Sequence, residues 1–79
     1  MAKKSAKELE IGGRFRFDIE SPKGHLILEI YDKEDDGTPW CLVTDHHYET
    51  PAEDEFEEED RYKRGDTMPF VFDDEVEVL

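Results

Sequence analysis

The sequence predicts a small α+β fold: a curled antiparallel β-sheet or small open barrel, with the order β-β-β-α-β(-β) and one acidic surface helix. Short segments alternate polar and apolar residues, which is the period of half-buried strands. Turns containing Pro or Gly separate these segments at short intervals. Residues 51–64 carry helix signals at both ends. With 79 residues, the chain can bury one thin core and has no room for a second domain.

The first expected strand covers residues 14–20, where polar and apolar side chains alternate without a break. Successive side chains of a strand point to opposite faces of the sheet. We therefore expect Phe15, Phe17 and Ile19 to face the core.

Two more strands are expected to follow in an antiparallel meander. Residues 21–24 (Ser-Pro-Lys-Gly) predict a turn, and residues 25–31 predict a strand that is apolar on both faces and therefore central. A long acidic turn over residues 32–39 leads to a third strand over residues 40–44, with His47 as its furthest extent. Loops this short favour antiparallel neighbours.

The helix over residues 51–64 is predicted from its ends. Thr50 and Glu53 form a capping box, and Pro51 occupies the first helical position. Gly65 stands where a glycine commonly ends a helix. The expected i,i+4 ion pairs are Glu57–Arg61, Glu59–Lys63 and Asp60–Arg64. The apolar face is thin, so we expect the helix to dock on the sheet mainly through Phe56.

One or two strands are expected to close the fold. Apolar residues alternate again within residues 67–72 and at Val76 and Val78. Asp73 and Asp74, between these segments, predict a tight turn or a bulge. The sequence leaves open how the closing strands join the sheet.

Charge dominates the composition, with 23 acidic residues against 10 basic ones and a net charge of −13. The first 16 residues hold five bases and two acids, so the excess acid lies in the rest of the chain. We expect a flexible basic N-terminal arm over residues 1–10 and a single small α+β domain over residues 11–79. The acidic body repels nucleic acid and anionic membranes and attracts basic surfaces. We therefore expect neither direct nucleic-acid binding nor membrane association.

The single cysteine, Cys41, indicates a reducing compartment, because it cannot form an internal disulfide. No apolar stretch approaches the roughly 18 residues of a membrane span. We therefore expect a cytoplasmic protein. Cys41 has no base near it in sequence and is expected to be a buried core thiol. No other motif predicts catalysis, so we expect neither enzyme activity nor a cofactor.

The acidic turn resembles the first half of a calcium-binding loop. Asp32, Glu34, Asp36 and Gly37 follow the spacing of that pattern. Its twelfth position requires a bidentate Glu, and Val43 stands there instead. We expect a solvated hairpin turn without calcium.

Asp45, His46, His47 and Glu49 are candidate metal ligands. Adjacent residues of a strand point to opposite faces, so only Asp45 and His47 of the first three can converge. His25 could join them from a neighbouring strand. Because the spacing is not specific and a closed site takes four ligands, we predict no metal site.

The acidic excess predicts a binding protein, an inhibitor or regulator that docks on a basic protein surface. A nucleic-acid-binding protein is the favoured partner, since carboxylates on a rigid helix can imitate the charges of DNA or RNA, as in proteins carried by phages or mobile elements. The expected acidic face consists of Glu53, Asp54, Glu55, Glu57, Glu58, Glu59, Asp60, Asp35, Asp36, Asp45, Glu49, Asp73 and Asp74.

Two other interpretations remain open at this point. The chain can be a structural or accessory domain of a larger assembly, with acid serving solubility. Its interface would then use the aromatic residues Tyr31, Trp40, Tyr48 and Tyr62. Alternatively, the acid can be an adaptation to high salt. The oligomeric state is not indicated by the sequence.

Overall fold

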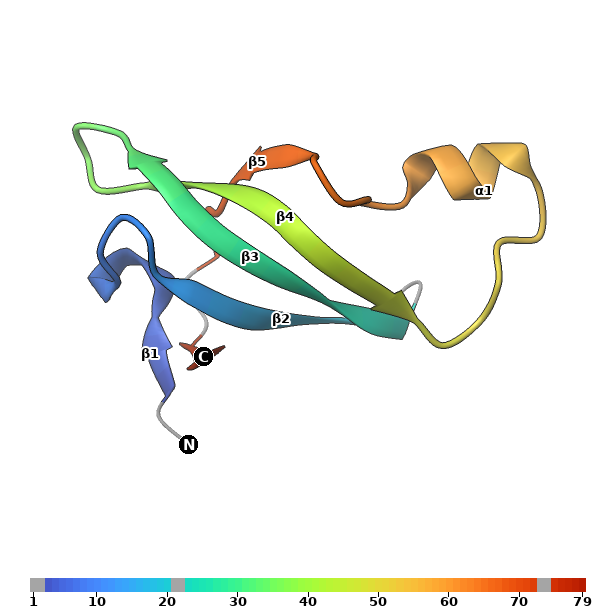
Figure 1. Cartoon of the computed structure of the whole chain (residues 1–79), viewed down its shortest axis with the longest axis horizontal. Coiled ribbons are helices and arrows are strands. Elements are labelled where there is room, and N and C mark those ends of the chain that lie inside the picture. The colour runs from blue at the N-terminus through green and yellow to red at the C-terminus, as the bar shows by residue number, and fades with distance from the viewer. Residues whose placement is uncertain (1–2, 21–22, 73–74) are drawn as a thin grey trace.

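A computed structural model describes residues 3–20, 23–72 and 75–79. In these residues an open, antiparallel, six-stranded sheet is accompanied by one short α-helix (Figure 1). The strands lie side by side in the order β1-β6-β2-β3-β4-β5. The elements are β1 (Lys3–Ser5), the 3-10 helix η1 (Ala6–Glu8), β2 (Arg14–Glu20), β3 (Lys23–Lys33), β4 (Pro39–Tyr48), α1 (Glu55–Asp60), β5 (Thr67–Pro69) and β6 (Glu75–Val78).

The predicted meander is confirmed by the pairing of β2 with β3 and of β3 with β4. Phe15 is fully buried, and Phe17 and Ile19 pack against the core from the same face of β2. The acidic turn between β3 and β4 is a hairpin in which the Glu34 amide donates to the Thr38 carbonyl at 2.9 Å. β3 and β4 are both longer than the strands predicted over residues 25–31 and 40–44.

The expectation that β3 is covered on both faces is wrong. Leu26, Leu28 and Ile30 are buried, but Ile27 is only half-buried and Tyr31 is 45% exposed. No helix or second sheet in the described part of the chain packs on the outer face of β3. The sheet therefore buries one face only.

That face is covered by the sheet's own C-terminal part. After β5 the chain leaves the β4 edge and passes over the buried face to reach β6 beside β2 (Figure 1). The buried ring of Phe70 lies 5.1 Å from Phe15 and 5.0 Å from Phe17, both edge-on. Phe72 stacks on Phe17 at 5.1 Å. These aromatic contacts take the place of a covering helix.

The N-terminal residues depart from the expected flexible arm and basic tail. Lys3–Ser5 pair with β6 as an edge strand, with Lys3 directly opposite Glu77. Ala6 and Leu9 are buried in the core. The opposite charges of Lys3 and Glu77 favour this pairing. The observed order of elements therefore begins one strand earlier than the predicted order.

The first closing strand is shorter than predicted, whereas the second includes Val76 and Val78 as expected. β5 ends at Pro69, and β6 runs over Glu75–Val78 between β1 and β2. The turn expected over residues 21–24 is too long, because Lys23 and Gly24 belong to β3 and pair with Glu20 and Ile19. Ser21 and Pro22, and the turn or bulge expected at Asp73 and Asp74, fall outside the described residues.

Candidate functional site

The connection between β4 and β5, residues 49–66, carries most of the predicted acidic face. Within it, seven of the eight positions from Glu53 to Asp60 are acidic. We call residues 53–60 the acidic segment. It extends beyond the end of the sheet and includes α1 (Figure 1).

The helix in this segment is much shorter than predicted. It covers six residues, Glu55–Asp60, and Asp54 rather than Thr50 is its N-cap. The Asp54 carboxylate accepts a hydrogen bond from the Glu57 amide at 2.8 Å, and the Glu57 carboxylate accepts one from the Glu53 amide at 3.1 Å. This reciprocal arrangement resembles a capping box placed four residues later than expected. Gly65 lies in a separate turn with φ +96°.

Arg61 anchors the acidic segment to the sheet. Its side chain is only 5% exposed. One guanidinium nitrogen donates to the Thr50 carbonyl at 2.8 Å, and the other donates to Glu57 at 3.0 Å. The guanidinium lies 4.7 Å above the ring of Tyr48 at the end of β4. The Tyr48 hydroxyl in turn donates to the Tyr62 carbonyl at 2.9 Å.

Through these contacts, Thr50 at the start of the connection and Tyr62 after α1 are both held at the end of β4. Burial raises the pKa of Tyr48 above its ordinary value, so the phenol stays a neutral donor. The Nε atom of Arg61 is buried and has no hydrogen-bond partner among the described residues. The acidic segment is thus fixed by polar contacts rather than by an apolar interface.

Most charges of the acidic segment are unpaired within the described part of the chain. Glu57 pairs with Arg61 at 3.0 Å, as predicted, and Glu58 pairs with Lys63 at 3.7 Å. The other two predicted helix pairs do not form. Five carboxylates have no ion pair among the described residues: Glu53, Asp54, Glu55, Glu59 and Asp60.

The remaining acidic residues of the predicted face lie elsewhere or are neutralised. Asp45 pairs with Arg64 at 3.6 Å, and Glu49 pairs with Lys23 at 3.8 Å.

Asp35 and Asp36 occupy the β3–β4 turn, at the other end of the 38 Å long axis from α1 (Figure 1). The Asp36 carboxylate accepts from the Thr38 amide at 2.9 Å, and this hydrogen bond lowers its pKa. Asp73 and Asp74 lie outside the described residues. The structure therefore gathers residues 53–60 and separates the turn from them.

The four predicted aromatic binding residues are also spread over separate parts of the molecule. Tyr48 lies under Arg61, and Trp40 is half-buried with its indole N–H donating to Glu34 at 2.9 Å. Tyr31 is 45% exposed on β3, and Tyr62 is 41% exposed in the loop between α1 and β5. The four residues do not form one aromatic patch.

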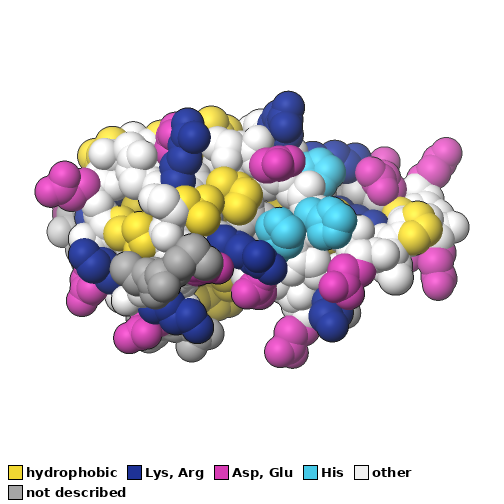
Figure 2. Space-filling view, turned by 60° about the horizontal axis from the view of Figure 1, so that its bottom comes forward, with side chains coloured by type: hydrophobic (Ala, Val, Ile, Leu, Met, Phe, Trp, Pro, Cys, Tyr) yellow, Lys and Arg dark blue, Asp and Glu magenta, His cyan; other side chains and the backbone are white. Residues whose placement is uncertain are grey.

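Phe56 is an exposed aromatic residue that was not among the predicted aromatic binding candidates. It is 79% exposed, and α1 buries no residue, so the expected docking of Phe56 on the sheet is wrong. Hydrophobic atoms lie between acidic side chains at the α1 end of the molecule (Figure 2). The sequence indicated this exposure, because the apolar face of the segment is thin and offers too little surface to dock a helix.

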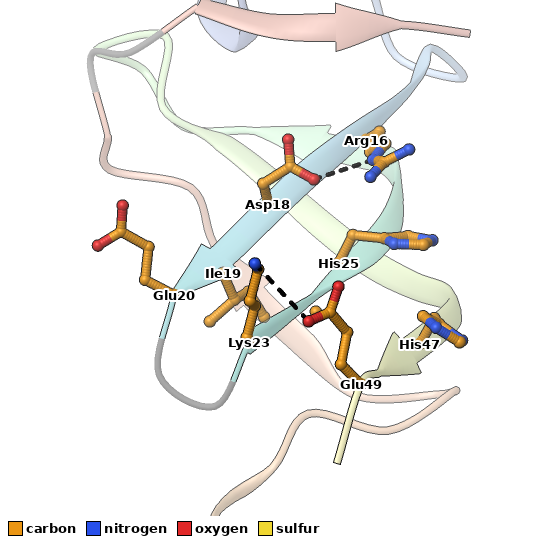
Figure 3. Close-up of a pocket in the computed structure, with 9 residues that line it drawn as sticks. Arg16, Asp18, Ile19, Glu20, Lys23, His25, His47 and Glu49 are labelled. Carbon is orange, nitrogen blue, oxygen red and sulfur yellow. Dashed lines mark hydrogen bonds and ion pairs between the residues drawn. The ribbon is translucent and has the colours of Figure 1, made fainter.

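A second feature is an open hollow of about 520 Å³ on the outer face of the sheet, near the β2–β3 end. Figure 3 shows the side chains that line it, contributed by β2, β3 and the end of β4. His25 and His47 extend from neighbouring strands toward the same side (Figure 3). Arg16 pairs with Asp18 at 2.9 Å beside them.

Chemistry elsewhere in the described residues is limited. Cys41 is fully buried, and burial raises the pKa of its thiol to about 11, which keeps it unreactive near neutral pH. Among the described residues, no group of three or more His, Cys, Asp or Glu side chains has the arrangement of a metal site.

No protein-family model, curated protein or solved structure matches this chain. In the part of the chain that the structure describes, no helix has the length and apolar character needed to cross a membrane. The function is therefore inferred from the residues themselves.

Proposed function

We propose that this protein is a small acidic binding protein, an inhibitor or regulator that docks on a basic surface of another protein. A nucleic-acid-binding protein is the favoured partner. The observation that carries the proposal is the acidic segment, where five carboxylates have no ion pair among the described residues and lie in, or just before, a helix that buries no residue. We further propose a non-enzymatic role in the cytoplasm, where the free thiol of Cys41 is stable.

Electrostatics supports docking through this segment. Clustered unpaired carboxylates raise the local concentration of basic partners and accelerate their association. Because Arg61 and the Asp54 cap hold the cluster in place, less conformational entropy is lost on binding than with a disordered acidic tail.

Imitation of DNA or RNA is the more specific form of this proposal. DNA carries one charge per roughly 1.7 Å of its axis, and consecutive acids on a helix are spaced about 1.5 Å along its axis. The acidic segment reaches this density only over about 10 Å, a small part of a binding site for nucleic acid. Docking on a basic protein surface does not need an array of acidic charges longer than this one.

The test is a pull-down with the immobilised protein, eluted along a salt gradient, with duplex DNA as competitor. We expect a nucleic-acid-binding protein that elutes at moderate salt and is displaced by DNA. A partner that resists high salt and ignores DNA would contradict the proposal.

Two matched triple variants locate the surface. The test variant combines Glu55→Gln, Glu59→Gln and Asp60→Asn, which leaves the ion pairs of α1 intact. The control variant combines Glu8→Gln, Glu10→Gln and Asp35→Asn, which removes the same charge far from α1 (Figure 1). Binding should be lost in the first variant and retained in the second. Equal loss in both would mean that only net charge matters.

A second candidate function is an accessory domain of a larger assembly. It is favoured by exposed apolar residues in the segment that follows β5, where Val71 is 64% exposed and Phe72 is 43% exposed. Such an interface would bind through apolar contact, so its affinity would change little with salt. The salt gradient described above distinguishes the two functions.

A further inference from the structure

His25 and His47 form a pair that the sequence alone could not establish. They are directly opposite each other in the register of β3 and β4, and their ring centroids are 5.4 Å apart. Gly24 precedes His25 and lies so close to the backbone of β4 that an added Cβ would collide with the His47 carbonyl oxygen. A glycine at this position therefore permits the close approach of the two strands that carry the histidines.

The spacing of the rings matches that of two imidazoles on one metal ion. With a Zn–N distance of about 2.1 Å and a tetrahedral angle at the metal, two ring centroids are about 5 Å apart. His47 is exposed and His25 is half-buried, so both rings can turn about the Cβ–Cγ bond to direct a nitrogen at a shared ion. The interplanar angle of 31° is compatible with such a turn.

The surroundings favour a cation. The hollow beside the histidines is lined by three carboxylates and two basic side chains: Asp18, Glu20, Glu49, Arg16 and Lys23. Each basic side chain is already paired with a carboxylate, at 2.9 Å for Arg16–Asp18 and 3.8 Å for Lys23–Glu49. The two cations are therefore neutralised locally, and the net charge of −13 adds a favourable long-range field.

We propose that His25 and His47 chelate a borderline divalent metal ion, with Zn²⁺ as the representative, on the outer face of the sheet. Imidazole nitrogen suits Zn²⁺, Cu²⁺ and Ni²⁺, whereas Mg²⁺ and Ca²⁺ prefer oxygen ligands. Since no third protein ligand has the required arrangement among the described residues, water completes the coordination. The site is an exchangeable one that bridges β3 and β4, and it is independent of the proposed docking function.

The test is calorimetric titration of the intact protein with Zn²⁺, near neutral pH, in physiological salt and excess Mg²⁺. The Mg²⁺ occupies carboxylates that would otherwise bind Zn²⁺ diffusely. We expect one Zn²⁺ per chain. His25→Gln and His47→Gln should each weaken binding at least about tenfold, since loss of even an outer-shell partner of a metal ligand costs about 10–100-fold.

His46→Gln is the matched control. His46 is adjacent to His47 but pairs with Leu26 in the register, and its ring lies beside Tyr48, so it cannot reach the same ion. It should bind Zn²⁺ as the unaltered protein does.

A second readout is the thermal midpoint, which Zn²⁺ should raise for the unaltered protein and for His46→Gln only. Circular dichroism of each variant without metal verifies its fold. The proposal is overturned if Zn²⁺ binding survives in both His25→Gln and His47→Gln, if His46→Gln weakens it equally, or if Mg²⁺ abolishes it.

Discussion

Replacement of Arg61 by Ala should release the acidic segment from the sheet while leaving the sheet folded. The side chain supplies two hydrogen bonds from a charged donor and one cation–π contact. Each such hydrogen bond contributes about 1.5–3 kcal/mol, and the cation–π contact about 0.5–2 kcal/mol. The unpartnered Nε offsets about 1–3 kcal/mol of this. Central values leave a net anchoring free energy of about 4 kcal/mol.

Native-state hydrogen exchange measures this anchoring directly. A loss of about 4 kcal/mol raises the opening equilibrium of residues 53–61 by roughly 1,000-fold, up to the limit of the unprotected rate. The amides of Glu57 and Glu58 report the change, because both donate to Asp54 in the native segment. Amides in the middle of β3 should keep their protection, since α1 contributes nothing to the core.

Arg64→Ala is the matched control for Arg61→Ala. Arg64 belongs to the same connection but is 74% exposed, with one hydrogen bond to the Thr44 carbonyl and a 3.6 Å ion pair with Asp45. Its removal should change exchange of the segment by less than about threefold, the effect of a weak surface pair. Unchanged exchange in Arg61→Ala would refute the anchoring role. Equal loss of protection in β3 would refute the independence of the segment.

Three further predictions concern stability. Gly24→Ala should lower the unfolding free energy by about 1–3 kcal/mol in denaturant titrations, because its Cβ would collide with the His47 carbonyl; unchanged stability would contradict this contact. Phe56→Ala should change the unfolding free energy by less than about 0.5 kcal/mol, since the ring is 79% exposed; a larger loss would mean that it packs on the protein. Burial raises the pKa of the Cys41 thiol from 9.0 to about 11. The neutral thiol therefore contributes its full stabilisation below pH 9, and this contribution is lost as the pH rises through 11. Relative to Cys41→Ala, the unfolding free energy should fall by about 3 kcal/mol over this range, and parallel pH profiles of the two proteins would contradict the assignment.

The β2–β3–β4 meander was predictable because the sequence features that specify it are local. Alternation places Phe15 and Leu28 on the core face whatever the rest of the chain does, and the intervening loops are too short for any other connection. The buried state of Cys41 was predicted separately, from the absence of a base near it in the sequence.

The extent of the helix was not predictable from its caps. Thr50 and Asp54 are both good N-caps, and the choice between them depends on a tertiary contact. The Thr50 carbonyl accepts from the buried Arg61, so it does not accept the first bond of a helix. A longer helix would also place like charges at i,i+4, as at Glu53–Glu57, and each such pair is destabilising.

The candidate sites were predicted in part. The sequence identified the residues of the acidic segment, but it could not show that Asp35 and Asp36 lie at the opposite end of the molecule. It also could not show that His25 faces His47, because the register of β3 against β4 includes bulges that no local pattern specifies.

The strand order has a consequence for how the chain folds during synthesis. β6 lies between β1 and β2, so among the described strands β1 has no partner until β6 has been synthesised. The β2–β3–β4 meander can form early from neighbouring segments, whereas the pairing of Lys3 with Glu77 closes a loop that holds all the intervening strands. Until that closure, the basic residues of β1 and the edge of β2 are open to other molecules, and chaperones or premature partners meet a different surface from that of the finished protein.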